Sequence, residues 1–436
     1  MSEYNDEFIE FPKDWEIKRL GEIAEQMYYG LSVSGIDTPT QYKLITTTSI
    51  NKETFKLDEE NIPFCNLITN KDIKSKELTK YFVKKGDILI SRSGTTGITI
   101  LVDKDYNNML FGSYLIKIRL NSIIDPKFFW YFAQSLFYWK QISSRGATIK
   151  NINLEILRNL RVPIPPLEEQ KKIVGILNTM DSIIIDTTNL IEKLKLLKEK
   201  TLNLLITGKI WHKEFKDTEI GKIPKNWEIV KLEEITIKIS DIDHKMPKKQ
   251  KNGIPFVSIK CILKYPDLNF YLDLNDPDLE FISKEDYEYY ARRFNVEKGD
   301  IIYSRFGSIG QAKLVTTEQP FIASYSIVLI KPDNHKVNSA FLTYILNSEV
   351  VVKQAKIATK GSTNKNLHLK DIENLEIPLP PLEEQKKIVE ILSTIDKKIE
   401  LETKYLEYLK RLKEKLLAAL MTGKIRVNSI AIGDLR

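Results

Sequence analysis

The sequence predicts an α+β chain that uses one unit twice. Each unit is a mixed α/β domain followed by a long helix, and the two helices pair as an antiparallel coiled coil about a pseudo-two-fold axis. Three observations predict this fold class. The segment Pro165–Val174 recurs without change as Pro380–Val389. Short runs rich in β-branched and aromatic residues precede both copies, and long proline-free stretches with helical apolar spacing follow them.

The repeat extends over most of the chain. Further segments match in the same order and at nearly the same spacing: Asp14–Ile23 with Asn226–Ile235, Lys85–Gly94 with Lys298–Gly307, Gly146–Asn151 with Gly361–Asn366, and Thr207–Ile210 with Thr422–Ile425. Residues 24–84 and 236–297 align poorly. We therefore interpret the chain as a tandem duplication in which a shared frame surrounds a variable interior.

The first part of each copy is expected to be a mixed α/β domain, at residues 11–165 and 213–380. Its predicted strands include Asp87–Ser91, Ser113–Leu120 and Ile322–Ile330, and its predicted helices are Pro126–Ser143 and Ser339–Lys356. These runs are broken by turn residues, as is typical of an α+β domain.

The second part of each copy is expected to be a long helix, at residues 166–212 and 381–426, with short tails at 1–10 and 427–436. Both helices begin after a Pro-Pro pair, and the two glutamates that follow suit the positive end of the helix dipole. Gly208 and Gly423 are expected to end the helices as C-cap glycines.

Apolar residues at alternating three- and four-residue spacing predict a coiled-coil seam on both helices. The seam residues expected to pair the helices and dock partners are Leu177, Met180, Ile184, Ile191, Leu194, Leu392, Ile395, Ile399, Leu406 and Leu409. Lys198 and Lys413 interrupt the seam with a leucine one place before each, so we expect the register to slip there. In the alternative, each seam packs only on its own domain, which the helix length disfavours.

Composition limits the function classes. The 66 Lys+Arg and 59 Asp+Glu give a formal charge of +7, too small to establish a nucleic-acid partner. No apolar run approaches the ~20 residues of a membrane span, and the N-terminus is acidic and polar rather than signal-like. The only two cysteines, Cys65 and Cys261, have no metal-like spacing. We expect a cytoplasmic protein without a disulfide framework, a metal site or a membrane partner.

Catalytic motifs are absent from the sequence. There is no Asn/Asp-Pro-Pro-aromatic motif of an adenine methyltransferase and no Gly-x-x-x-x-Gly-Lys-Ser/Thr loop of an ATP-driven motor. The Pro-Asp pairs at 266–267, 277–278 and 332–333 have no Asp/Glu-x-Lys tripeptide downstream at the distance that a nuclease site needs. The four histidines are scattered along the chain. We expect no catalytic residues and no cofactor bound by this chain.

Two variable domains that alternate with two near-identical long helices, each opened by Pro-Pro-Leu-Glu-Glu-Gln and ended near Thr-Gly-Lys-Ile, resemble the specificity subunit of type I restriction-modification enzymes. The segment Ile220–Ile229 also resembles the family's domain-start motif. The first copy departs from that motif, since Phe8–Trp15 keeps only its Pro-x-x-Trp portion. The resemblance covers residues 11–426.

The resemblance implies a function and a set of partners. Each variable domain would be a target-recognition domain that reads one half of a bipartite, asymmetric site in double-stranded DNA. The helices would set the half-site spacing and dock two modification subunits, which carry S-adenosylmethionine and methylate adenine. Restriction subunits that use ATP and Mg²⁺ would join the complex. The specificity subunit itself would be non-catalytic.

Three groups of residues are candidates for DNA contact, because phosphates are bound by Lys, Arg and hydroxyl groups, and base edges by Arg, Lys, Asn and Gln. The first group lies on two loops after strands: Ser91, Arg92, Ser93 and Thr95, and Ser304, Arg305 and Ser308. The second lies on the two Gly-x-Thr-x-Lys-Asn loops: Arg145, Thr148, Lys150 and Asn151, and Lys360, Ser362, Thr363 and Lys365. The third lies on a basic stretch: Lys245, Lys248 and Lys249.

Each group has a simpler interpretation. The arginine of the first loops could pair with Asp87 or Asp300 in a tight turn, the second loops could be helix N-caps, and the basic stretch could be a solvated loop. Base-specific contacts are expected from divergent segments such as residues 41–51 and 244–252. The alternative functions are a coiled-coil scaffold that binds protein ligands, and a methyltransferase with an unusual motif.

Overall fold

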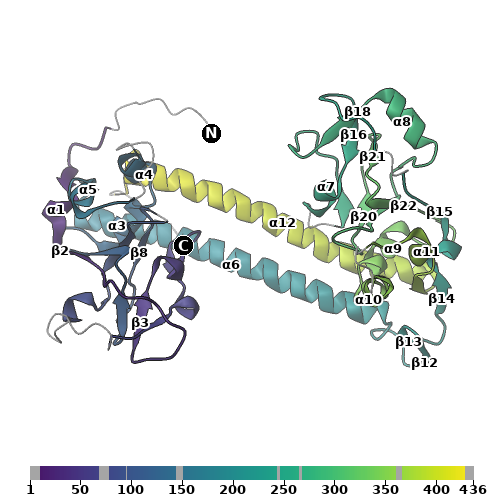
Figure 1. Ribbon diagram of the computed structural model, residues 1–436, viewed down its shortest axis with the longest axis horizontal. Coiled ribbons are helices and arrows are strands. Elements are labelled where there is room, and N and C mark those ends of the chain that lie inside the picture. The colour runs from purple at the N-terminus through teal and green to yellow at the C-terminus, as the bar shows by residue number, and fades with distance from the viewer. Residues whose placement is uncertain are drawn as a thin grey trace. The chain divides into compact units, whose positions relative to one another are not determined.

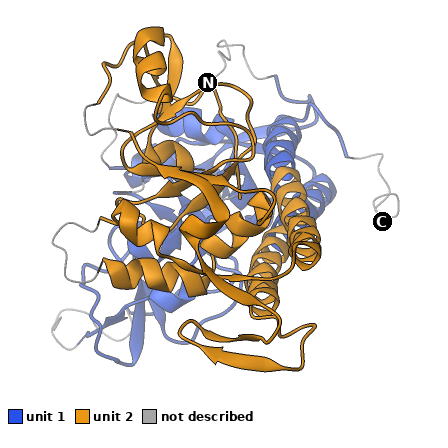
Figure 2. Cartoon of the chain, turned by 90° about the vertical axis from the view of Figure 1, so that its right-hand side faces the viewer, with its two compact units in different colours: residues 1–186, 406–436 blue, residues 187–405 orange. Residues whose placement is uncertain are grey.

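The chain forms two compact units in the computed structural model, which describes residues 10–67, 78–94, 96–143, 151–242, 246–264, 268–359 and 366–427. Unit 1 comprises residues 1–186 and 406–436, and unit 2 comprises residues 187–405 (Figure 2). The two long helices are α6 (Leu167–Ile206) and α12 (Leu382–Met421), 40 residues each (Figure 1). Each unit therefore holds one α/β domain and a part of both long helices: residues 167–186 and 406–421 in unit 1, and residues 187–206 and 382–405 in unit 2.

The domain of unit 1 is built on a four-stranded antiparallel sheet. Its strand order is β2 (Ala24–Tyr29), β10 (Leu115–Leu120), β7 (Ile88–Ser91), β8 (Thr99–Leu101). A second sheet has the order β6 (Phe64–Cys65), β3 (Tyr42–Ile45), β9 (Met109–Phe111). The strands predicted around residues 88 and 115 are confirmed, and β7 is buried along its whole length.

Shorter elements complete unit 1. They are the pairs β1 (Glu16–Arg19) with β11 (Arg161–Ile164) and β4 (Ile50–Asn51) with β5 (Lys56–Leu57), the 3-10 turns η1 (Thr47–Ser49), η2 (Glu59–Asn61) and η3 (Thr79–Tyr81), and the helices α1 (Leu20–Ile23), α3 (Pro126–Phe132), α4 (Leu136–Ser143) and α5 (Leu154–Arg158).

Unit 2 repeats this plan. Its main sheet has the order β15 (Thr236–Ser240), β22 (Ile327–Pro332), β19 (Ile301–Ser304), β20 (Ala312–Val315), β17 (Asn269–Phe270), and its second sheet has the order β18 (Glu280–Ile282), β16 (Ile254–Val257), β21 (Ile322–Ala323). The other elements are β12 (Phe215–Thr218) with β13 (Gly221–Pro224), β14 (Glu228–Lys231) with β23 (Glu376–Leu379), η4 (Leu232–Ile235), α7 (Ile259–Leu263), α8 (Lys284–Ala291), α9 (Ser339–Leu346), α10 (Glu349–Ala358) and α11 (Leu369–Glu373).

Three predicted elements are divided in the structure. The predicted strand 322–330 becomes β21 and β22, because a turn after Ala323 takes the chain from one sheet to the other. The predicted helices 126–143 and 339–356 each become two helices, with turns before Leu136 and Glu349. The apolar spacing does not mark these turns, since the helices on both sides contribute to the same core.

The glutamine of each repeated block fastens the start of a long helix to its domain. Gln170 is fully buried; its Oε1 accepts from the backbone N–H of Asp125 at 2.7 Å, and its Nε2 donates to the carbonyl of Pro165 at 2.8 Å. Gln385 makes the same pair of bonds with Asn338 and Pro380, at 2.8 and 2.9 Å. Buried amides need such partners, so the repeated glutamine is a structural requirement of the junction.

The preceding glutamate binds the tryptophan of the Pro-x-x-Trp segment. The indole N–H of Trp15 donates to Glu169 at 3.0 Å, and that of Trp227 donates to Glu384 at 3.1 Å. The partners of the two carboxylates then differ. Arg426 donates to Glu169 at 2.9 Å, whereas the Nε2 of His212 lies 2.6 Å from Glu384. In each unit, one carboxylate joins the start of one long helix to the chain just after the end of the other.

The seam packs α6 against α12 within each unit. In unit 1, Leu177 belongs to one apolar core with Leu420 of α12, and in unit 2, Leu205 belongs to one core with Leu392. The start of one helix thus meets the end of the other in both units, which confirms the antiparallel coiled coil. The expected register slip is wrong in α6, because Leu197 is 51% exposed while Lys198 stays on the seam.

Both helices end at a glycine in the left-handed region, as predicted, with φ of 66° at Gly208 and 68° at Gly423. The glycines also allow a close contact. A Cβ on Gly208 would lie 2.2 Å from Cγ of Pro224, and one on Gly423 would lie 2.3 Å from Cγ of Pro12. These prolines belong to the two Pro-x-x-Trp segments.

Replacing Gly423 by alanine is expected to lower the free energy of unfolding by at least about 1 kcal/mol, because an L-residue is strained at this φ and its Cβ would meet Pro12. Gly175, inside α6, is the matched control: its Cβ would meet nothing within 4 Å. Gly175→Ala is expected to stabilise the protein by about 0.5–1 kcal/mol through helix propensity. Urea unfolding followed by circular dichroism measures the free energy of unfolding of both variants. Equal changes in the two variants would contradict a special role for Gly423.

Candidate nucleic-acid interface

The structure brings two predicted groups of DNA-contact residues together in each unit. In unit 1, the loop after β7 pairs with the end of the Gly-x-Thr-x-Lys-Asn segment through a bridge between Ser93 and Asn151. In unit 2, the loop after β19 makes the same bridge between Phe306 and Asn366. The carbonyl of the loop arginine also accepts the backbone N–H of Ile152 or Leu367, at 2.8 and 3.0 Å. The shared sequence therefore builds one backbone arrangement twice.

The aspartates before these strands do not hold the loop arginines. Asp87 is fully buried, and its Oδ1 lies 2.5 Å from Nη2 of Arg119 on β10. Asp300 lies 2.7 Å from Nζ of Lys331 on β22, and burial raises the pKa of its carboxyl. Each aspartate also accepts the backbone N–H three residues before it. These carboxylates anchor the turn that leads into the central strand.

The two loop arginines have different surroundings. Arg92 is half-buried, and its guanidinium lies over the ring of Tyr29 at 4.6 Å. Its Nε is buried and has no hydrogen-bond partner among the described residues. Arg305 is 4% exposed and forms an ion pair with Asp241. Arg305 also donates from Nε to Asn366 at 3.4 Å. Arg92 thus keeps hydrogen-bonding capacity that Arg305 uses within unit 2.

Ser91 and Ser304 have structural partners. Both are fully buried, and their hydroxyls donate to the carbonyls of Ser93 and Ser308. Of the same loops, Ser308 is exposed and Ser93 is half-buried. The exposed members can reach a ligand, while the buried serines shape the loop.

The other candidates are only partly described. Asn151 and Lys248 are exposed, and Lys249 is exposed with its Nζ 2.7 Å from Glu280. Thr95, Arg145, Thr148, Lys150, Lys245, Lys360, Ser362, Thr363 and Lys365 lie outside the described residues. DNA contact by any of these residues stays a prediction.

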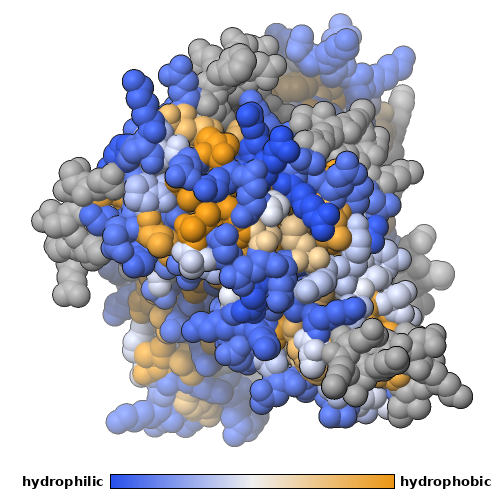
Figure 3. Space-filling view, turned by 90° about the vertical axis from the view of Figure 1, so that its left-hand side faces the viewer, coloured by the Kyte–Doolittle hydropathy of each residue, from blue (hydrophilic) through white to orange (hydrophobic). Residues whose placement is uncertain are grey.

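The face of the protein seen in Figure 3 is mainly hydrophilic, with separate apolar patches between polar side chains. The described part of the chain contains no group of three or more His, Cys, Asp or Glu that could hold a metal ion. Both cysteines are buried and free. No described helix is long and apolar enough to cross a membrane.

The predicted docking residues lie in the seam, so most of their surface packs within the chain: Leu177, Met180, Ile191, Leu392 and Leu409 are buried, and Ile184, Leu194, Ile395, Ile399 and Leu406 are half-buried. A different row on α6 is open to solvent. Leu190, Leu197 and Leu204 are 39%, 51% and 45% exposed and lie seven residues apart. We call them the outer leucine row. The row was not predicted, because one seam was assigned to each helix, although the seven-residue spacing of these leucines is visible in the sequence.

Comparisons with known proteins agree with this architecture. The chain is 31% identical to a putative type I restriction enzyme MjaX specificity subunit of Methanocaldococcus jannaschii, over 97% of this chain and 96% of that protein. It is 26% identical to the EcoKI specificity subunit of Escherichia coli, over 70% of this chain and 66% of that protein.

Solved structures share the fold. A chain from a study of complex assembly and conformational transition in the type I R-M system aligns with a TM-score of 0.59 at 20% identity, over 95% of this chain and 100% of that chain. A type I S subunit from M. genitalium aligns with a TM-score of 0.53 at 17% identity, over 96% and 98%.

The family model described as "Type I restriction modification DNA specificity domain" matches twice, at residues 12–196 and 224–411. These matches cover both halves of the duplication, each with most of its long helix. The chain therefore belongs to the family of type I restriction-modification specificity subunits.

Proposed function

We propose that this chain is the DNA-recognition subunit of a type I restriction-modification complex, in which the domain of each unit reads one half of a bipartite, asymmetric site. The observation that carries the proposal is the duplicated frame. In both units the loop after the central strand, β7 or β19, pairs with the end of the Gly-x-Thr-x-Lys-Asn segment, whereas residues 24–84 and 236–297 differ in sequence. A shared frame suits contacts to the DNA backbone, which is the same at every site, and divergent interiors suit different base sequences.

In this proposal the chain is non-catalytic. Adenine methylation with S-adenosylmethionine belongs to two modification subunits, and ATP- and Mg²⁺-dependent cleavage belongs to restriction subunits. The lack of methyltransferase, ATP-loop and nuclease motifs in the sequence supports this division. In such a complex α6 and α12 determine the spacing between half-sites and hold the modification subunits.

Salt dependence of DNA binding tests the proposal against a protein-binding scaffold. If phosphates are contacted, the logarithm of affinity for duplex DNA falls linearly with the logarithm of salt concentration. Methylome sequencing of a host with and without the gene then returns the bipartite motif. Affinity that is independent of salt, or a methylome that does not change, would favour the scaffold. Incorporation of label from S-adenosylmethionine by the purified chain alone would contradict the non-catalytic assignment.

The outer leucine row supports docking of a partner helix. Three leucines at seven-residue spacing form the type of seam that accepts a second helix. Lys193 and Lys200 lie between them along α6 and are exposed. This surface fits an amphipathic helix of the modification subunit with apolar residues at heptad spacing and acidic flanks.

Leu197→Glu is expected to weaken binding of the modification subunit by more than about tenfold, since a charge would be buried at the centre of the row. The folded chain should keep its stability, because Leu197 is 51% exposed. Titration calorimetry with the purified modification subunit measures the affinity. Leu136→Glu, at a leucine that is 54% exposed on α4, is the control and should bind normally. Equal binding by both variants would remove the row from the interface.

A further inference from the structure

A Lys–Asp–Tyr contact occurs twice, once in each unit, and joins three elements each time. In unit 2, Asp396 of α12 lies 2.5 Å from Nζ of Lys198 of α6 through one carboxylate oxygen, and its other oxygen accepts the hydroxyl of Tyr344 of α9 at 2.7 Å. In unit 1, Asp181 of α6 makes the same contacts with Lys413 of α12 and Tyr131 of α3, at 2.6 and 2.8 Å. We call these contacts the unit 1 and unit 2 triads.

The triads lie in surroundings that strengthen them. The side chains of Lys198 and Asp396 are 24% and 25% exposed, and those of Lys413 and Asp181 are 22% and 20% exposed. Each lysine also lies over its tyrosine ring, at 5.6 Å in unit 2 and 5.9 Å in unit 1. Burial and the neighbouring aspartate raise the pKa of both tyrosines, so the hydroxyls stay protonated and donate. Partial burial makes such pairs stronger than surface ion pairs.

The lysines occupy seam positions. An apolar residue there would pack against the facing helix in more than one register, whereas a lysine must meet its aspartate. Single polar residues within a coiled-coil seam are the devices that specify register, at some cost in stability. Because the same aspartate also holds a helix of the α/β domain, one carboxylate fixes both the register of the helix pair and the attachment of the domain to it.

We propose that Asp181 and Asp396 are positioning residues that determine which half-site spacing the chain accepts, by holding each domain and both long helices in a single arrangement. This inference rests on the proposed function. It differs from a general stabilising role because it concerns the choice among DNA sites and not affinity for all of them.

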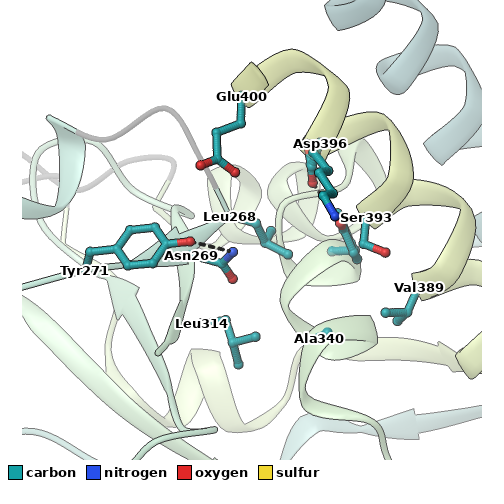
Figure 4. Close-up of a pocket in the computed structure, with 11 residues that line it drawn as sticks. Leu268, Asn269, Tyr271, Leu314, Ala340, Val389, Ser393, Asp396 and Glu400 are labelled. Carbon is teal, nitrogen blue, oxygen red and sulfur yellow. Dashed lines mark hydrogen bonds between the residues drawn. The ribbon is translucent and has the colours of Figure 1, made fainter. Parts of the chain in front are cut away.

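The two triads differ in one neighbour. In unit 1, Asn178 offers the Tyr131 hydroxyl a second acceptor at 2.9 Å. The corresponding residue in unit 2 is Ser393, whose hydroxyl donates to the carbonyl of Glu390 instead. Ser393, Tyr344 and Asp396 line a cavity of about 260 Å³ in unit 2, and Figure 4 shows Ser393 and Asp396 side by side on α12 above Leu314 and Ala340. Within the part of the chain that the structure describes, the tyrosine of the unit 2 triad therefore lacks the second acceptor that its counterpart in unit 1 has. Removing the unit 2 aspartate should change the spacer preference more than removing the unit 1 aspartate.

The experiment uses the full chain in complex with its modification subunits and a series of DNA duplexes that carry the parent half-sites with spacers of different length. Binding is measured for the wild type, Asp396→Asn, Asp181→Asn and Tyr344→Phe. The asparagine keeps the size of the aspartate and loses the ion pair, and the phenylalanine loses only the hydroxyl. The preference for the parent spacer over one altered by one base pair is expected to fall by about fivefold in Asp396→Asn and Tyr344→Phe, and by less in Asp181→Asn.

The control is Lys386→Met, which removes an ion pair to Glu383 within α12, at side chains 61% and 80% exposed. Its spacer preference should equal that of the wild type. Variants that lose affinity equally for all spacers, or lose none, would overturn the inference and leave the triads with a structural role alone. A wild-type complex that prefers no bipartite site at all would overturn the proposed function, and the inference with it.

Discussion

Replacing Trp227 by alanine is expected to lower the free energy of unfolding of unit 2 by about 3–5 kcal/mol, the range measured when large aromatic side chains are removed from protein cores. Trp227 is fully buried in the core that also contains residues of both long helices and of β19. Its ring packs edge-on to His212 at 5.9 Å. The variant therefore loses apolar contacts and also the donor to Glu384, whose side chain is 14% exposed.

Trp227→Phe reduces these losses, because it keeps a six-membered aromatic ring and removes the fused pyrrole ring together with its N–H. It is expected to cost about 2–3 kcal/mol, from one lost hydrogen bond to a charged group and a smaller cavity than that of Trp227→Ala. Trp211→Ala is the matched control in the same unit, since Trp211 is 40% exposed. Its effect should stay near 0.5 kcal/mol, as at most surface positions. Urea unfolding followed by circular dichroism, rather than tryptophan fluorescence, compares the three variants. A Trp227→Ala effect no larger than that of Trp211→Ala would contradict the assigned role.

The sequence was sufficient to predict the architecture because its strongest signals are local or repeated. The proline-free stretches and their glycines predicted α6 and α12 to within a few residues. The unchanged block Pro165–Val174 indicated the duplication. Local apolar runs predicted β7 and β10. Each of these features depends on residues close together in the chain, or on a comparison of the chain with itself.

The contacts that the sequence could not predict join distant residues. Trp15 and Glu169 are 154 positions apart, and Trp227 and Glu384 are 157 apart. The sequence predicted only that the glutamates suit the helix dipole. Their hydrogen bonds to tryptophan can be recognised only once the fold is known. Lys198 was interpreted as an interruption of the seam because its partner, Asp396, lies on the other helix. The pairing of Arg305 with Asp241, rather than Asp300, is a third example.

The loop arginines give the prediction that most directly separates DNA binding from folding. Arg305→Ala is expected to lower the free energy of unfolding of unit 2 by about 3 kcal/mol, because it leaves the carboxylate of Asp241 buried with one partner fewer. Among the residues that the structure describes, the remaining partner is Arg293, whose Nη2 lies 3.3 Å from Oδ1 of Asp241 and whose side chain is 52% exposed. The double variant Arg305→Ala/Asp241→Ala should lose less than the sum of the single variants, since the unpaired charge is gone.

Arg92→Ala, in contrast, is expected to lower affinity for DNA and to leave the free energy of unfolding nearly unchanged. Its stacking on Tyr29 contributes about 0.5–1 kcal/mol, so stability changes little. If its guanidinium meets a phosphate, affinity for duplex DNA should fall by about 1 kcal/mol, and the slope of log affinity against log salt should decrease by about 1. Arg92→Lys is the control, because it keeps the charge and should recover the salt slope. If Arg92→Ala and the wild type have equal affinity and equal salt slope, Arg92 does not contact DNA and has only a structural role in the turn. Contacts between the shared frame and the DNA backbone of the unit 1 half-site would then have to come from other residues of the paired loops, such as the exposed Asn151.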